Sequence, residues 1–138
     1  MSTEQTVPSS VTVSDWSEEP YPATDEMPKV SLASWHTSYE GDLAGTGEVR
    51  LLLTYTAGDS ADPHTLEADY VGYEKIEATA GERRGSFVLR MRGSHGKDGA
   101  SGAGEIVADS GTGDFAGVSG TYEATATAMT YPVTFTFS

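Results

Sequence analysis

The 138-residue chain contains no cysteine, few basic residues and no long apolar run. The missing cysteines exclude disulfides, thiolate metal sites and a cysteine nucleophile, and they fit a reducing compartment. Only 8 Lys and Arg stand against 21 Asp and Glu, and this net charge of −13 argues against binding to nucleic acid or to an anionic membrane. No stretch approaches the roughly 20 apolar residues of a membrane-spanning helix, and no signal peptide is recognisable. We therefore expect a cytoplasmic protein.

Helical periodicity is missing as well, and apolar and polar residues alternate instead, as in strands with one buried face. We expect a flexible arm over residues 1–9 and a single domain over residues 10–138. The expected strands cover residues 11–16, 29–39, 48–56, 66–80, 83–93, 105–108, 122–129 and 133–137. The glycine-rich residues 94–104 form either a loop or a strand with little side-chain bulk. About eight antiparallel strands predict an all-β sandwich or barrel, and a closed barrel leaves no exposed edge.

One expected strand places a carboxylate on an otherwise apolar face. In residues 68–76 the side chains of Tyr70, Glu74 and Ile76 point one way, because successive strand residues face opposite sides of a sheet. An enclosed carboxylate is costly unless it is paired, and its raised pKa suits it to general acid or base work. Glu74 is therefore the first catalytic candidate, with Tyr70 and Tyr55 as groups that polarise a carbonyl. The alternative is a structural carboxylate that is bonded near a barrel end.

Further inward-facing residues define a candidate binding surface. The alternation predicts an interior that consists of ordinary core packing or of the wall of an apolar cavity. Trp16 and Glu18 follow at the end of the first strand, where they can fold over the barrel mouth. The candidate substrate-binding residues are Trp35, Tyr39, Leu51, Leu53, Phe87, Leu89, Met91, Trp16 and Glu18. The spacing of the three histidines suggests no metal site.

Five ordered motifs carry a family resemblance. They are WSEEPY over residues 16–21, YEGDLAGTG over 39–47, YVGYEK over 70–75, GERRGSFVL over 81–89 and SGTGDFAG over 110–117. Together they resemble a bacterial family of domains of unknown function whose members are similar to small allene oxide cyclase barrels, of the calycin-like kind. Members usually have a glutamine and a histidine where this chain has Arg90 and Met91, which indicates a divergent, specialised member of a biosynthetic kind.

The resemblance implies a cofactor-independent cyclase or isomerase of secondary metabolism. Such an enzyme holds a polyene or polyketide-like molecule inside the barrel and closes a ring or shifts a bond, without metal or cofactor. The alternative is a non-catalytic, lipocalin-like barrel that carries a small apolar ligand. A third reading is a packed barrel that serves as a structural subunit. The outer face permits a homodimer or trimer.

Overall fold

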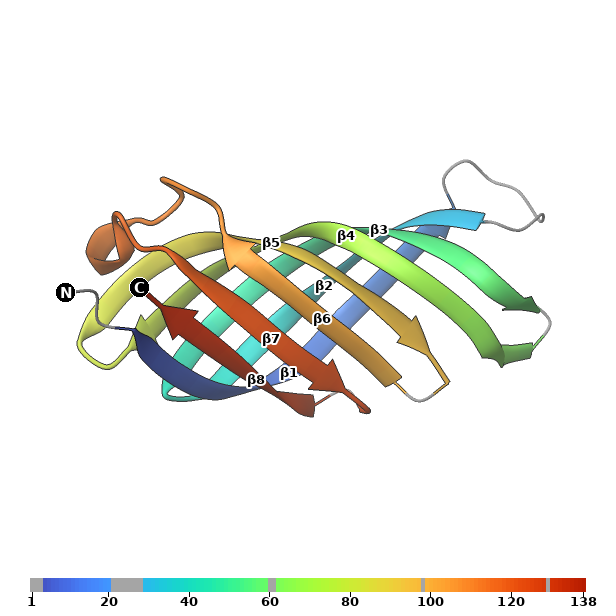
Figure 1. The fold of residues 1–138 in the computed structure, drawn as a ribbon, viewed down its shortest axis with the longest axis horizontal. Helices are drawn as coiled ribbons and strands as arrows, with labels where there is room; N and C mark the ends of the chain where they lie inside the picture. Colours follow the sequence, from blue (N-terminus) through green and yellow to red (C-terminus); the bar gives the residue numbers. More distant parts are fainter. Residues whose placement is uncertain (1–3, 21–28, 60–61, 98, 129) are drawn as a thin grey trace.

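The computed structural model describes residues 4–20, 29–59, 62–97, 99–128 and 130–138. Its elements are β1 (Gln5–Pro20), β2 (Lys29–Gly41), β3 (Leu43–Asp59), β4 (Asp62–Ala80), β5 (Arg83–Gly96), β6 (Gly99–Ile106), the 3-10 helix η1 (Gly113–Phe115), β7 (Gly120–Ala126) and β8 (Thr130–Phe137). Each strand pairs antiparallel with the next, and β8 pairs with β1, so the sheet closes on itself (Figure 1). The predicted all-β, eight-stranded antiparallel barrel is confirmed.

Two segments that were expected to be flexible or were left undecided are strands in the structure, and both matter for closure. Residues 5–9 belong to β1 and not to a flexible arm, and Val7 pairs with Phe135 of β8 and is buried. Residues 1–3, which were also assigned to the arm, lie outside the described residues. The glycine-rich stretch takes the second of its two expected forms, because β6 starts at Gly99. Both segments have few large apolar residues, so their strand conformation depends on backbone pairing with the neighbouring strands.

The alternation of side chains sorts the strands as predicted. On β3 and β5 the inward residues Val49, Leu53 and Leu89 are buried, with at most 5% of their surface exposed. The neighbouring Arg90 and Arg92 are on the outer face. The barrel interior is therefore built by every second residue of each strand.

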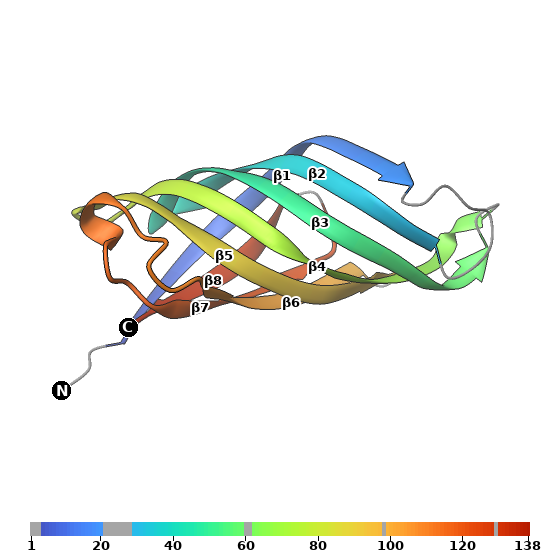
Figure 2. The same ribbon diagram turned by 90° about the horizontal axis from the view of Figure 1, so that it is seen from above.

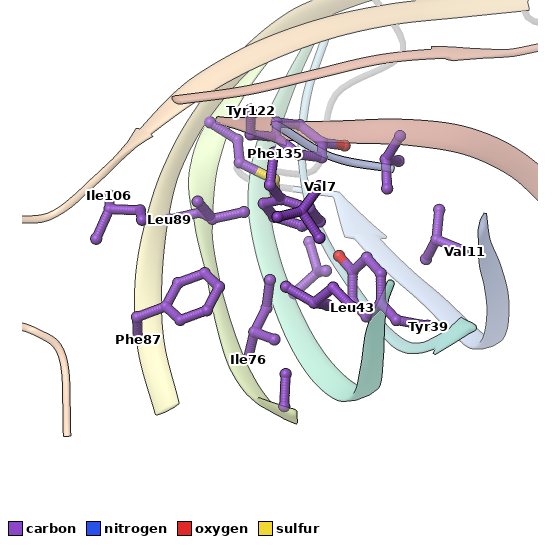
Figure 3. Packing of buried hydrophobic residues seen from close by; sticks show 14 of the residues in the cluster. Val7, Val11, Tyr39, Leu43, Ile76, Phe87, Leu89, Ile106, Tyr122 and Phe135 are labelled. Carbon is purple, nitrogen blue, oxygen red and sulfur yellow. The ribbon is translucent and has the colours of Figure 1, made fainter. Parts of the chain in front are cut away.

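One end of the barrel is filled with aromatic rings, and we call it the plugged end. It holds the start of β1, the end of β8 and η1, while the turns between β5 and β6 and between β7 and β8 lie at the opposite, open end (Figure 1). Phe115 of η1 is fully buried against Phe87 and Phe137, with ring centroids 5.1 and 5.8 Å away. The core side chains converge on the interior (Figure 3). Phe115 of η1 therefore closes this end of the barrel.

A bulge in β1 changes which of its residues face inward. The pairing of β1 with β2 shifts register between Ser14 and Ser17, and Asp15 has a φ of 57°. Such an extra residue reverses the alternation beyond it. Val11 before the bulge points inward and is buried, whereas Trp16 and Glu18 take the inward positions after it. The bulge thus brings an indole and a carboxylate to the open end.

Candidate ligand cavity

The open half of the barrel encloses a cavity of about 720 Å³. Its lining includes residues of β2 and β3 and residues of β6 and β7. These two pairs of strands form opposite sides of the barrel (Figure 2). The lining residues are Val13, Trp16, Trp35, Leu51, Leu53, Tyr55, Leu66, Ala68, Tyr70, His95, Gly96, Lys97, Gly99, Ala100, Gly102, Tyr122, Ala124, Ala126, Thr127, Ala128 and Tyr131. The volume is within the range of small-molecule sites, roughly 300 to 1,000 Å³, and the lining is mostly apolar.

The cavity exists because one wall has small side chains at its inward positions. The inward residues of this wall are Ala100 and Gly102 on β6 and Ala124 and Ala126 on β7, and they leave the cavity open. At the plugged end, phenylalanines fill the corresponding part of the interior. The glycines also leave room for a ring, because a Cβ at Gly102 would meet the Tyr70 hydroxyl. The Tyr70 hydroxyl donates weakly to the carbonyl oxygen of Ser101 at 3.4 Å. The Tyr70 ring therefore lies along this bare part of the wall.

Two stacked tryptophans form the most distinctive part of the opposite wall. The rings of Trp16 and Trp35 are parallel to within 11°, and their centroids are 4.5 Å apart. Trp16 is 50% exposed, whereas the indole Nε1 of Trp35 is buried. Within the described part of the chain, this Nε1 has no hydrogen-bond partner. The pair offers flat aromatic surface to a bound molecule.

A hydrogen-bonded carboxylate stands beside the cavity at the open end. Glu18 Oε2 accepts a hydrogen bond from the Tyr55 hydroxyl at 2.6 Å and another from the Ser31 hydroxyl at 2.9 Å. Burial raises the pKa of Tyr55, and the hydrogen bond to Glu18 raises it further. Tyr55 lines the cavity and Glu18 lies behind it. The arrangement holds a phenol hydroxyl in place next to the ligand space.

A second carboxylate is enclosed deeper in the barrel. Glu74 is 2% exposed, and its Oε2 accepts hydrogen bonds from the Tyr39 hydroxyl at 2.5 Å and from the Thr37 hydroxyl at 2.7 Å. A Cβ at Gly47 would meet both the Glu74 carboxylate and the Thr37 hydroxyl, so the glycine makes room for this cluster. The sequence correctly identified an inward carboxylate on β4, and its hydrogen-bond partners are other side chains of the barrel interior.

The environment of Glu74 favours its neutral form. Burial raises the pKa of Glu74 to about 7, although the hydrogen bonds from Tyr39 and Thr37 lower it. In turn, burial and the nearby Glu74 charge raise the pKa of Tyr39. A carboxyl group with such a pKa can take up or release a proton near neutral pH.

The structure divides the twelve residues predicted for the site into two groups. Six line the cavity: Trp16, Trp35, Leu51, Leu53, Tyr55 and Tyr70. Six do not line it: Glu18, Tyr39, Glu74, Phe87, Leu89 and Met91. Glu18 reaches the cavity through its hydrogen bond to Tyr55. The other five are buried and belong to the core around Glu74 and the plugged end.

Sequence reasoning missed the tyrosines of the last two strands. Tyr122 and Tyr131 line the cavity, and burial raises the pKa of both. The charge of Glu74 acts on both hydroxyls, so the deep carboxylate lies within electrostatic reach of the cavity floor. Their alternation with polar residues was a usable signal, but β7 and β8 have few other bulky residues to mark an inner face.

The described residues include neither a cluster of metal-binding side chains nor a helix long enough to span a membrane. No group of three or more His, Asp or Glu side chains there is placed to hold a metal ion. None of the helices in that part of the chain has the length and apolarity needed to cross a membrane.

Fold and cavity together define an up-and-down β-barrel with an internal, mostly apolar cavity. Residues 7–137 match the family described as protein of unknown function, DUF3224, and the chain therefore belongs to this family. The expected membership of a domain-of-unknown-function family is thus confirmed.

Other comparisons extend this result only to the fold. A crystal structure of a protein with unknown function from the DUF3224 family of Shewanella oneidensis MR-1 is similar, with a TM-score of 0.67 and 22% sequence identity. The likeness covers 99% of this chain and 96% of that chain. A search of curated proteins finds no match.

Proposed function

We propose that this protein binds a small, mostly apolar molecule inside the open half of its barrel, in the cytoplasm. The observation that carries the proposal is the contrast between the two halves of one interior. Phenylalanines pack the plugged end, whereas alanines and glycines leave about 720 Å³ at the other. Protein interiors are normally close-packed, so a lined space of this size calls for an occupant.

The polar groups of the cavity support an occupant with few charges. Tyr55, Tyr70, Tyr122 and Tyr131 bring phenol hydroxyls to an otherwise apolar wall. Such groups orient a carbonyl or hydroxyl without the desolvation cost of an ion. With a net charge of −13 and this interior, the partner is a small molecule and not a nucleic acid.

A second candidate function is chemical turnover of the bound molecule by a cofactor-independent cyclase or isomerase. The hydrogen-bonded Tyr55 and Glu18 pair supports it, because it fixes a phenol hydroxyl at the cavity wall. The resemblance to allene oxide cyclase barrels, proposed from the sequence, points the same way. The cavity would hold one reactive conformer while Tyr55 or Tyr70 polarises a carbonyl.

Glu74 has a different place in this second candidate. Its carboxylate does not line the cavity, and Tyr39 and Thr37 occupy one of its oxygens. Its influence on a bound molecule would pass through the field that it exerts on Tyr122 and Tyr131. We therefore expect Tyr55→Phe to reduce turnover more than Glu74→Gln. If Glu74→Gln lost turnover while Tyr55→Phe kept it in full, the chemistry would be assigned to the Glu74 carboxylate instead.

Binding is tested first with the fluorescent probe N-phenyl-1-naphthylamine. Ala124 points into the cavity and Thr125 points outward on the same strand, so Ala124→Phe and Thr125→Phe add the same ring on opposite faces. We expect the wild type and Thr125→Phe to bind the probe with similar affinity and Ala124→Phe to bind at least about tenfold more weakly. Equal binding by all three proteins would place the probe outside the cavity and contradict the proposal.

A further inference from the structure

The chain has two tryptophans, and both meet at the cavity wall. Trp35 comes from the regular part of β2, and Trp16 comes from the bulged part of β1. Their rings stack at 4.5 Å. Flat aromatic surface of this kind attracts other flat π systems through stacking, beyond the gain from area burial alone. It therefore favours a conjugated occupant over a saturated one of equal size.

The buried N–H of Trp35 adds a polar requirement. Buried indole N–H groups usually have a hydrogen-bond partner, and a missing partner is destabilising because the group has lost its hydrogen bond to water. Within the described residues the Nε1 of Trp35 has none. A ligand that carries an acceptor can remove this penalty, whereas a pure hydrocarbon cannot.

The side chain stacked on Trp35 is only partly covered by the protein. Trp16 is 50% exposed and directly follows Asp15, a non-glycine residue with a φ of 57° at the register shift of β1. A left-handed conformation is unfavourable for such a residue and persists where the surroundings hold it. On the outer face, Asp15 Oδ2 lies 3.0 Å from His36 Nδ1, which anchors the bulge. The contact between Asp15 and His36 thus holds the backbone, while half of the Trp16 surface is exposed to solvent.

We propose that the ligand is a flat, conjugated molecule with a hydrogen-bond acceptor. It stacks on the tryptophan pair and accepts a hydrogen bond from Nε1 of Trp35 after a small displacement of Trp16. This inference rests on the proposed binding function and specifies the chemical class of the ligand. The Tyr55 and Tyr70 rings add aromatic surface to the same cavity, and the alanines of β6 and β7 leave room for it.

Three probes of similar size separate the two requirements. 2-Acetylnaphthalene is flat and has a carbonyl acceptor, 2-ethylnaphthalene is flat without an acceptor, and 2-acetyldecalin has the acceptor on a saturated ring system. Their affinities are measured by displacement of N-phenyl-1-naphthylamine, and quenching of the two tryptophans reports contact with the site. We expect 2-acetylnaphthalene to bind roughly tenfold more tightly than either of the other two.

Two variants locate the preference. Trp35→Phe keeps a ring and removes the N–H, so the advantage of 2-acetylnaphthalene over 2-ethylnaphthalene should disappear. Trp16→Phe leaves the Trp35 N–H in place and should retain that advantage. Equal affinity for all three probes, or a ketone preference that survives in Trp35→Phe, would overturn this inference. The binding function would still stand in both cases, provided that Ala124→Phe weakens binding of N-phenyl-1-naphthylamine and Thr125→Phe does not.

Discussion

The buried Glu74 makes the stability of the barrel depend on pH in a predictable direction. The folded protein holds the Glu74 proton with a pKa of about 7, compared with 4.5 for a free side chain. An acid whose pKa is raised by folding binds more protons in the folded state between these two values, so stability falls as the pH rises from 4.5 to 7. Each pKa unit corresponds to about 1.4 kcal/mol, which gives a loss of roughly 2 to 3 kcal/mol between about pH 5 and pH 8.

Glu74→Gln isolates this effect because glutamine keeps an acceptor oxygen and does not ionise. Urea denaturation of the wild type and of Glu74→Gln is measured from about pH 5 to pH 8, and the difference between their free energies of unfolding is plotted. We expect the variant to gain roughly 2 to 3 kcal/mol relative to the wild type over this range. Glu77→Gln removes a charge from the exposed face of the same strand and should show a much smaller change. Parallel curves for wild type and Glu74→Gln would refute the reasoning.

Three further substitutions test other parts of the structure. Gly47→Ala should cost roughly 1 to 3 kcal/mol of stability by urea denaturation, because its Cβ would meet the Glu74 carboxylate and Thr37. An equal loss in a Glu74→Ala background would argue against the clash with the Glu74 carboxylate. Phe115→Ala should cost about 3 to 5 kcal/mol, as for other buried rings, and a loss below about 1 kcal/mol would mean that the plug is dispensable. Tyr55→Phe should change the thermal midpoint little, since Glu18 is exposed; a shift of many degrees would show that the pair holds the mouth together.

Much of the fold was readable from the sequence because each strand has one buried face. The alternation placed Leu51 and Leu53 of β3 and Leu89 of β5 in the interior, and it identified Glu74 as an enclosed carboxylate.

The cavity itself could not be predicted, because it depends on which residues the closed sheet brings opposite each other. The small side chains Ala100 and Ala124 face the wall that carries Trp35 only after the barrel has closed. Glu18 faces inward only because β1 has one extra residue at Asp15, and no sequence pattern in β1 predicts a bulge there. A shift of one residue reverses every side chain beyond it.

The most direct test of ligand binding is a crystal structure of the protein with 2-acetylnaphthalene. The predicted result is density for the probe inside the open half of the barrel, against Trp35 and between Leu53 and Ala124. Density confined to the outer face, or an open half that is filled by the protein's own side chains, would contradict the account.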